Sequence, residues 1–182
     1  LQLGNELYVN YNSKNENRIG YFKIEIYKAY TPIYFDDAKK LNCIISAINL
    51  VKLLTADSQS NKKIYDLLIK FYLDLSEDDW LRLYIFWELK LLSHLGYNLD
   101  LDSMVKKKIE DNKILYVVES AKEKKIVPNF LIDRDNHNYN LDILLDGLKL
   151  VGDFMDKTIL KPNNVNFPIS RNQFVNSLKN LD

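Results

Sequence analysis

Hydrophobic residues recur at three- and four-residue steps along most of this chain. Side chains at these steps share one face of an α-helix, so the pattern predicts a largely helical protein. The third expected helix is apolar on nearly every side, which indicates the most buried helix. Ser76 with the acidic residues 77–79 should cap it, and Gly96 is suited to end it. The expected helices cover residues 36–54, 64–75, 78–95 and 140–159, and a last short helix opens at 170.

Other stretches alternate apolar and polar residues, which is the period of a β-strand with one buried face. Residues 7–11 and 20–27 are separated by a polar turn, so they predict a β-hairpin. An isolated hairpin is marginal in water, so we expect it to pack on further strands or on the helices that follow. Farther along, residues 113–118 resemble a short strand, and residues 126–127 can return as its partner.

One acidic residue departs from the apolar pattern of the third helix. Every position that shares a helix face with Glu88, at offsets of three, four and seven, is apolar. An isolated buried charge is too costly, so this carboxylate must have a partner or keep its proton. We expect it to bind backbone N–H groups or Arg171 in a structural role, and direct contact with a partner protein is the alternative. The neighbours on its face are Leu81, Tyr84, Ile85, Leu91, Leu92 and Leu95.

The composition indicates a folded protein and makes several classes of site less suitable. The 182 residues are 47% hydrophobic, which is ample for a packed core, and 25 basic residues balance 25 acidic ones. A net charge of zero argues against a strong global field for nucleic acid or membrane, although a local patch stays open. Cys43 is the only cysteine, so a disulfide or a cysteine zinc site within the chain is excluded, and a reducing, cytoplasmic setting fits.

The sequence shows no apolar stretch long enough to span a bilayer and no signal peptide, so we expect no membrane partner. It begins with Leu1 and not with an initiator methionine, which we interpret as a start inside a longer protein.

Few residue patterns point to catalysis or to a metal. His94 and His137 are the only histidines, and they lack the spacing of metal ligands. Asp100 and Asp102 could form a paired acid/base site, but turn and capping roles suit them better. The acidic turn around Asp133 lacks the glycine and the distal glutamate of a calcium loop. No phosphate-binding loop or nucleophile motif occurs, so we expect no enzyme, no metal and no cofactor.

Two basic clusters are candidates for nucleic-acid contact. In the expected hairpin, basic residues are interleaved with aromatic ones, which suits single-stranded bases; packing of one aromatic face inward is the alternative. The second cluster could contact phosphate if its strands bring it together, although a lysine run is usually a solvated face. The hairpin set is Lys14, Arg18 and Lys23 with Tyr8, Tyr11, Tyr21 and Phe22; the second is Lys106, Lys107 and Lys108 with Lys122, Lys124 and Lys125.

Three segments, in matching order and spacing, carry the motifs of one known family. Residues 86–101 resemble F-E-x-x-L-L-x-x-L-G-Y-x-x-D-L, and residues 1–5 resemble L-Q-P-G-N. Residues 147–154 and 167–171 resemble the tail G-L-x-L-x-x-x-F … L-P-A-A-R. The chain thus resembles the RecO family of bacterial DNA repair and recombination mediators, and its tail resembles that of the alphaproteobacterial members. The resemblance spans nearly the whole chain.

This resemblance implies a mainly α fold. Residues 1–32 would be the C-terminal part of an OB-fold barrel, and residues 33–182 an all-helical domain with a short inserted β-hairpin. Many family members carry four zinc cysteines, but Ser103 stands where the first would fall and the others have no counterpart. Residues 103–128 would therefore replace the zinc module. The first part of the barrel, with a basic loop implicated in DNA contact in the family, would be absent from this chain.

The resemblance also implies a function. RecO-like proteins bind single- and double-stranded DNA, anneal complementary strands, dock on the C-terminal tail of the single-stranded DNA-binding protein, and help RecR to load RecA. We therefore expect a cytoplasmic, nucleoid-associated repair mediator with a basic, apolar groove for an acidic, aromatic-ended peptide. The alternative is a helical module that docks on RecR or on the single-stranded DNA-binding protein without binding DNA. The helix-borne candidates for partner contact are Arg82, Lys90 and Lys149.

Overall fold

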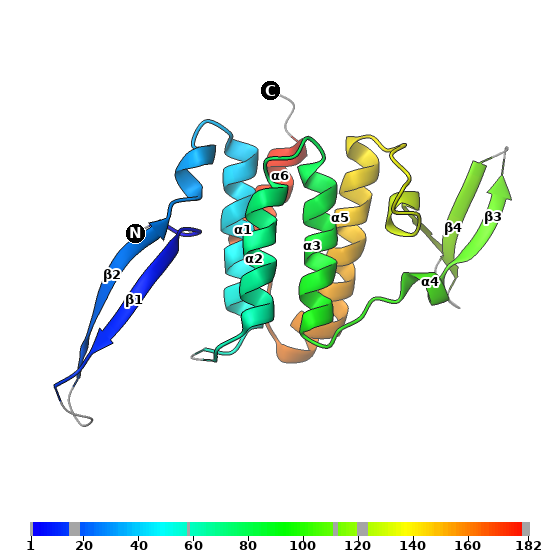
Figure 1. Cartoon of the computed structure of the whole chain (residues 1–182). Helices are drawn as coiled ribbons and strands as arrows, with labels where there is room; N and C mark the ends of the chain where they lie inside the picture. The colour runs from blue at the N-terminus through cyan, green and yellow to red at the C-terminus, as the bar shows by residue number, and fades with distance from the viewer. Residues whose placement is uncertain (1, 15–18, 58, 111–112, 120–123, 180–182) are drawn as a thin grey trace. The chain divides into compact units, whose positions relative to one another are not determined.

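The computed structural model describes residues 2–14, 19–57, 59–110, 113–119 and 124–179 (Figure 1). The chain forms two compact units. One unit comprises residues 1–54 and 168–182, and the other comprises residues 55–167. Each unit combines helices with a small antiparallel sheet of its own.

The first unit begins with a hairpin formed by β1 (Glu6–Asn12) and β2 (Tyr21–Lys28). Because residues directly opposite each other project from the same face, the register sorts the side chains into two sets. The apolar face carries Leu7, Val9, Tyr11, Phe22, Ile24 and Ile26, and the other face carries Tyr8, Asn10, Asn12, Tyr21, Lys23 and Glu25. Most of these side chains are exposed on both faces.

A glycine and an asparagine close the base of this hairpin. Gly4 has a φ of +91°, in the left-handed region that favours glycine. The side-chain oxygen of Asn5 accepts the Thr31 N–H at 3.1 Å, and the Thr31 hydroxyl donates to the Leu3 carbonyl at 2.6 Å. The two ends of the hairpin are thereby joined, immediately before the 3-10 helix η1 (Thr31–Tyr34).

Two helices complete the first unit. α1 (Ala38–Leu54) and α6 (Ile169–Lys179) pack against each other. The Asn49 amide on α1 donates to the Ser170 hydroxyl on α6 at 3.1 Å, which fixes the pair laterally. Cys43 is fully buried, as its place in an apolar helical run predicts.

The second unit is built on α2 (Lys62–Asp74), α3 (Trp80–His94) and α5 (Leu141–Met155). Figure 1 shows α2 and α3 side by side and antiparallel, and α5 packs on α3. α3 therefore has a helix on two sides, which explains why it is apolar around most of its circumference. α5 runs on into a π-helical turn, η3 (Asp156–Leu160), and a 3-10 turn, η4 (Lys161–Asn163).

Side-chain caps fix where most of these helices begin. Asp37, Asn61 and Asn140 each accept the backbone N–H of the third residue on, at 2.9, 3.2 and 3.0 Å. The expected acidic cap of α3 is an exception, because Asp79 makes no side-chain bond to the helix backbone. Its carboxylate binds other side chains, which are described with the site.

A short helix, α4 (Leu101–Met104), leads into a three-stranded antiparallel sheet. Its strands lie in the order β3 (Lys106–Glu110), β4 (Lys113–Glu119) and β5 (Lys124–Val127), and the 3-10 helix η2 (Asn129–Leu131) follows. The expectation of an inserted two-stranded hairpin is therefore incomplete. β3 escapes the sequence pattern because it is a lysine run without alternation.

The fold class agrees with the prediction, since a small hairpin precedes a mostly helical region that contains a second small sheet. Within the described residues, no helix has the length and apolar character needed to cross a membrane. The assignment of residues 1–32 to an OB barrel and the replacement of a zinc module by residues 103–128 stay predictions.

Candidate partner-binding groove

An apolar groove of about 780 Å³ is lined by α2 and α3. Leu67 of α2 and Leu83, Phe86 and Trp87 of α3 form its apolar lining. Trp87 is held firmly, because its indole N–H donates to the Leu67 carbonyl at 3.1 Å and its ring stacks on Tyr84 with centroids 5.6 Å apart. Trp87 is 3% exposed, so it supports the wall of the groove, and the half-buried Phe86 supplies the more accessible aromatic surface.

Basic residues lie at one end of this groove. On both helices the lining residues recur at three- and four-residue steps, so each helix contributes one continuous stripe. Because α2 and α3 are antiparallel (Figure 1), Lys63 near the start of α2 lies at the same end of the groove as Lys90 and His94 near the end of α3. This basic end combines two exposed ammonium groups with a half-buried imidazole.

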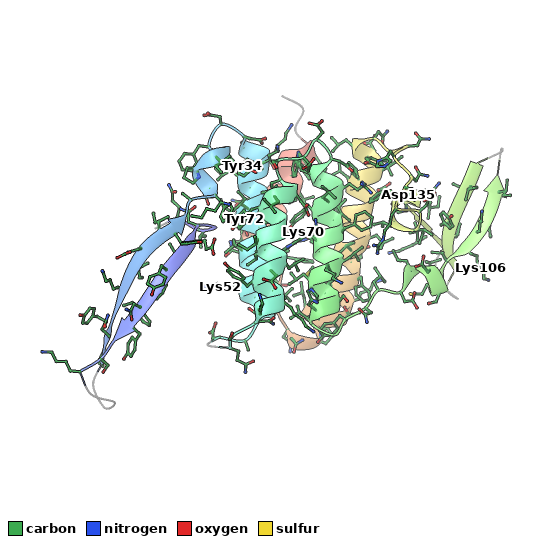
Figure 2. All side chains as sticks on the ribbon, viewed as in Figure 1. Tyr34, Lys52, Lys70, Tyr72, Lys106 and Asp135 are labelled. Carbon is green, nitrogen blue, oxygen red and sulfur yellow. The ribbon has the colours of Figure 1, made fainter. Side chains whose placement is uncertain are left out.

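The opposite end is also basic. Lys70 and Asp74 of α2 form an ion pair at 2.7 Å, and Figure 2 labels Lys70 beside α3. Arg82 near the start of α3 and Arg134 in the loop after η2 complete this end. The cations that line the groove are Lys63, Lys70, Arg82, Lys90 and Arg134, and the lining carboxylates are Asp66 and Asp74. The groove therefore carries a net positive charge.

Arg82 also holds this end of the groove together. Its guanidinium forms an ion pair with Asp79 and donates to the Arg134 carbonyl at 3.0 Å. The Tyr139 hydroxyl donates to the second Asp79 oxygen at 2.7 Å. The pKa of Tyr139 is raised, mainly because the hydroxyl is partly buried and secondly because of this hydrogen bond. Arg82 and Arg134 each lie 5.5 Å from the centre of the Phe86 ring. Arg82 thus fixes the loop to α3, while the Arg134 side chain stays exposed.

Glu88 is fully buried on α3, as the apolar pattern around it predicts. The Tyr84 hydroxyl donates to its Oε1 at 2.8 Å. This hydroxyl is not among the partners expected from the sequence. No buried side-chain nitrogen or oxygen of the described residues lacks a hydrogen-bond partner, so the carboxylate is satisfied. Arg171 is itself buried on α6, and its pairing with Glu88 stays a prediction.

A second groove, of about 430 Å³, is lined by α4, β4, β5 and α5. It contains Lys149, so the structure separates this candidate partner contact from Arg82 and Lys90. Its apolar lining is mostly aliphatic, and Lys125 pairs with Asp153 across it at 3.3 Å. Its charged residues are Lys125, Lys149, Lys157, Asp146 and Asp153.

The register of the hairpin divides the basic and aromatic residues expected to contact DNA. Lys23 shares its face with Tyr8 and Tyr21, and all three are exposed. Tyr11 and Phe22 lie on the opposite, apolar face, with their ring centroids 5.1 Å apart. The register therefore divides the interleaved residues between two faces, and Lys23 shares its face with the rings of Tyr8 and Tyr21.

The remaining nucleic-acid candidates are more scattered. Lys14 is exposed, and Arg18 lies outside the described residues. On β3, Lys106 and Lys108 project from one face of the sheet and Lys107 from the other. β4 separates β3 from β5, so the strand order does not bring these lysines beside Lys125. The register therefore divides the lysines of β3 between two faces, Lys122 lies outside the described residues, and phosphate contact by this cluster stays a prediction.

The motif in residues 86–101 includes the end of α3 and the turn that follows it. Gly96 has a φ of +88° at the C′ position. The N–H groups of Gly96 and Tyr97 donate to carbonyls of the last turn at 3.1 and 2.9 Å, which is the Schellman arrangement. Beyond this turn, the Asp100 carboxylate accepts the Ser103 N–H at 3.3 Å and caps α4. Asp100 thus has the capping role that its spacing favours.

More than half of the chain matches a known protein family. The family model described as Recombination protein O C terminal matches residues 36–142, which are 107 of the 182 residues. The chain belongs to the RecO family. Its match to the RecO model extends from the residues before α1 to the start of α5, so it includes the whole α2–α3 groove.

Relatives in alphaproteobacteria extend the RecO match over most of the chain. The DNA repair protein RecO of Rhodospirillum centenum is 23% identical over 96% of this chain and 75% of its own length. That of Wolbachia pipientis wMel is 26% identical over 94% and 79%, and that of Rickettsia africae is 28% identical over 89% and 73%. No solved structure matches the chain significantly.

Proposed function

We propose that this RecO-family chain is a DNA repair and recombination mediator that binds an acidic, aromatic-ended partner peptide in the α2–α3 groove. The peptide is the C-terminal tail of the single-stranded DNA-binding protein. The observation that carries this proposal is the apolar, aromatic lining between two basic ends. The relatives, which are DNA repair proteins, support a role in DNA repair.

The chemistry of the groove matches such a peptide. An aromatic ligand side chain would contact Phe86 and Trp87, and burial of an aromatic ring removes about 150–250 Å² from water. Carboxylates of the peptide would meet Lys63 and Lys90 at one end or Arg134 at the other, where charge-assisted hydrogen bonds contribute about 1.5–3 kcal/mol each. Because the whole chain has no net charge, this attraction is local to the groove.

DNA contact is assigned in this proposal to the polar face of the hairpin. Tyr8 and Tyr21 offer rings on which unpaired bases can stack, and Lys23 offers a cation for the phosphate backbone. With DNA on the hairpin and the tail peptide in the groove, the chain would anneal complementary strands and, with RecR, help to load RecA on coated DNA. These are the functions that the RecO resemblance implies, here assigned to particular surfaces of the chain.

A charge exchange in the groove tests the peptide site. We expect Lys90→Glu to weaken binding of a fluorescent acidic peptide that ends in phenylalanine by about tenfold or more, measured by anisotropy. Lys149→Glu is the matched control, because it makes the same charge change at an exposed helix position in the second groove. Equal losses in the two variants would show that the attraction is not specific to the α2–α3 groove.

A protein-interaction module without DNA binding is the second candidate. It is favoured by the zero net charge and by the pairing of Lys23 with Glu25 at 3.0 Å, which offsets the cation on the polar face. Titration with single-stranded DNA at increasing salt separates the two. Binding that weakens with salt and is lost in Tyr8→Ala/Tyr21→Ala supports the mediator. Peptide binding with no DNA binding at low salt supports the module.

A further inference from the structure

One end of the α2–α3 groove holds a histidine near two lysines. The charged groups that act on the His94 imidazole are Lys90, one turn earlier on α3, and Lys63, near the start of α2. Asp66 lines the groove about one turn farther along α2, and it forms an ion pair with Lys62 at 3.3 Å. A ligand carboxylate drawn to the two ammonium groups would therefore lie close to the imidazole as well.

The imidazole is the lining group whose ordinary pKa lies nearest to neutral pH. Burial lowers the pKa of His94, and the positive charges of Lys90 and Lys63 lower it further. The ring is therefore mostly neutral at pH 7 in the free groove. An anion bound at this end opposes the effect of the two lysines, because it attracts a proton to the ring. The C-terminal end of α3 also favours an imidazolium here.

We propose that His94 is a proton-linked contact for a carboxylate of the bound peptide. The imidazole takes up one proton from solvent as the peptide binds, and the resulting imidazolium donates an N–H to the carboxylate; the proton returns to solvent on release. This inference rests on the proposed peptide groove, and it adds a contact whose strength depends on pH.

The direction of the pH dependence follows from linkage. The pKa of His94 is higher in the complex than in the free groove, so the added affinity is fully present below the free pKa. It is lost as the pH rises through the bound-state pKa. The ordinary pKa of a carboxylate of the peptide is near 4, well below this window. Between about pH 6 and pH 8, affinity should therefore follow the histidine.

Calorimetric titration of the full chain tests the proposal. The acidic peptide ending in phenylalanine should bind about three- to tenfold more tightly near pH 6 than near pH 8, at constant ionic strength. Near neutral pH, the heat of binding should also depend on the ionisation enthalpy of the buffer, because a proton is taken up. Equal affinity at both pH values, with buffer-independent heat, would overturn the proton link and leave the peptide groove intact.

Two histidine variants locate the proton. His94→Gln should remove both the pH dependence and the buffer dependence, while His137→Gln should keep them, since His137 is exposed and does not line the groove. Retention of the linkage in His94→Gln would overturn the assignment.

Nuclear magnetic resonance of the unaltered protein gives a second measurement that needs no variant. The pKa of His94 should rise when the peptide is added, and that of His137 should not. An unchanged His94 pKa in the saturated complex would contradict the proposal. Failure of the peptide to bind at any pH would overturn the proposed function together with this inference.

Discussion

The two grooves of the second unit are lined by similar types of residue in different proportions. The α2–α3 groove has an aromatic lining and five cations against two carboxylates. The groove beside α5 has a mostly aliphatic lining and three lysines against two aspartates. Lys125 and Asp153 neutralise each other in the second groove, whereas Lys90 and Arg134 stay exposed in the first. We therefore expect the balance of charge, and not apolar surface with nearby lysines alone, to distinguish the groove proposed for the acidic peptide.

The largest loss of stability is expected from a substitution in α3, the helix that lines the first groove. Glu88→Ala should lower the free energy of unfolding by about 3 kcal/mol, because it removes the buried acceptor of the Tyr84 hydroxyl. Chemical denaturation measures the loss. Glu88→Gln is the matched control, since it keeps an acceptor of the same shape. A loss below about 0.5 kcal/mol in the alanine variant is typical of a surface site and would contradict the buried role.

A methyl group at Gly147 should disturb the helix that forms the second groove. A Cβ at this position of α5 would lie 2.6 Å from the ring of Phe130, which is almost fully buried. Overpacking should outweigh the better helix propensity of alanine and cost about 2 kcal/mol in Gly147→Ala. Thermal unfolding would show the loss, while affinity of the folded variant for the acidic peptide should change little. A stabilised variant would mean that Phe130 moves aside without cost.

The turn that ends α3 should give a smaller effect. Gly96→Ala places a side chain at a φ of +88°, with nothing within 4 Å to clash. Only backbone strain remains, so the expected loss is about 1 kcal/mol. Denaturant unfolding of Gly96→Ala and Gly96→Asn separates strain from contact, because asparagine tolerates this conformation better. Equal losses in the two variants would point to a cause other than the backbone.

The smallest effect is expected from the ion pair of the second groove. The Lys125 and Asp153 side chains are 40% and 44% exposed, so Lys125→Ala should change stability by less than about 0.5 kcal/mol. Asp153→Asn should remove one negative charge from this groove at a similarly small cost. If charge balance alone separates the grooves, the Asp153→Asn protein should gain weak peptide binding that survives Lys90→Glu. No gain would show that the aromatic lining is also needed.

Much of the fold could be predicted because local patterns determine it. The period of the apolar residues locates the helices, and Gly96 marks the end of α3. The burial of Glu88 follows from its neighbours on one helix face. These features depend on residues close in sequence, so the helical period expresses them directly.

The site depends on contacts that no local pattern contains. Lys63 and Lys70 recur with Leu67 at helical steps, but the sequence does not reveal that this stripe faces α3. Arg134 comes from a loop, where no periodicity signals its position. Asp79 has the spacing of a cap, yet it binds Arg82 and a distant tyrosine because tertiary partners compete with the helix backbone.

The two-faced hairpin limits the insertions and deletions that the chain can tolerate. One face is mainly apolar and the other mainly polar, because successive side chains of a strand project to opposite faces. Insertion or deletion of one residue within β2 would transfer Lys23 to the apolar side and Phe22 to the polar side. By contrast, a single substitution in the hairpin would change only the contacts of that one side chain. A gain or loss of one residue inside the strand would exchange both faces at once, whereas the register shift between Glu6 and Leu7 shows that the base of the hairpin already accommodates an irregularity.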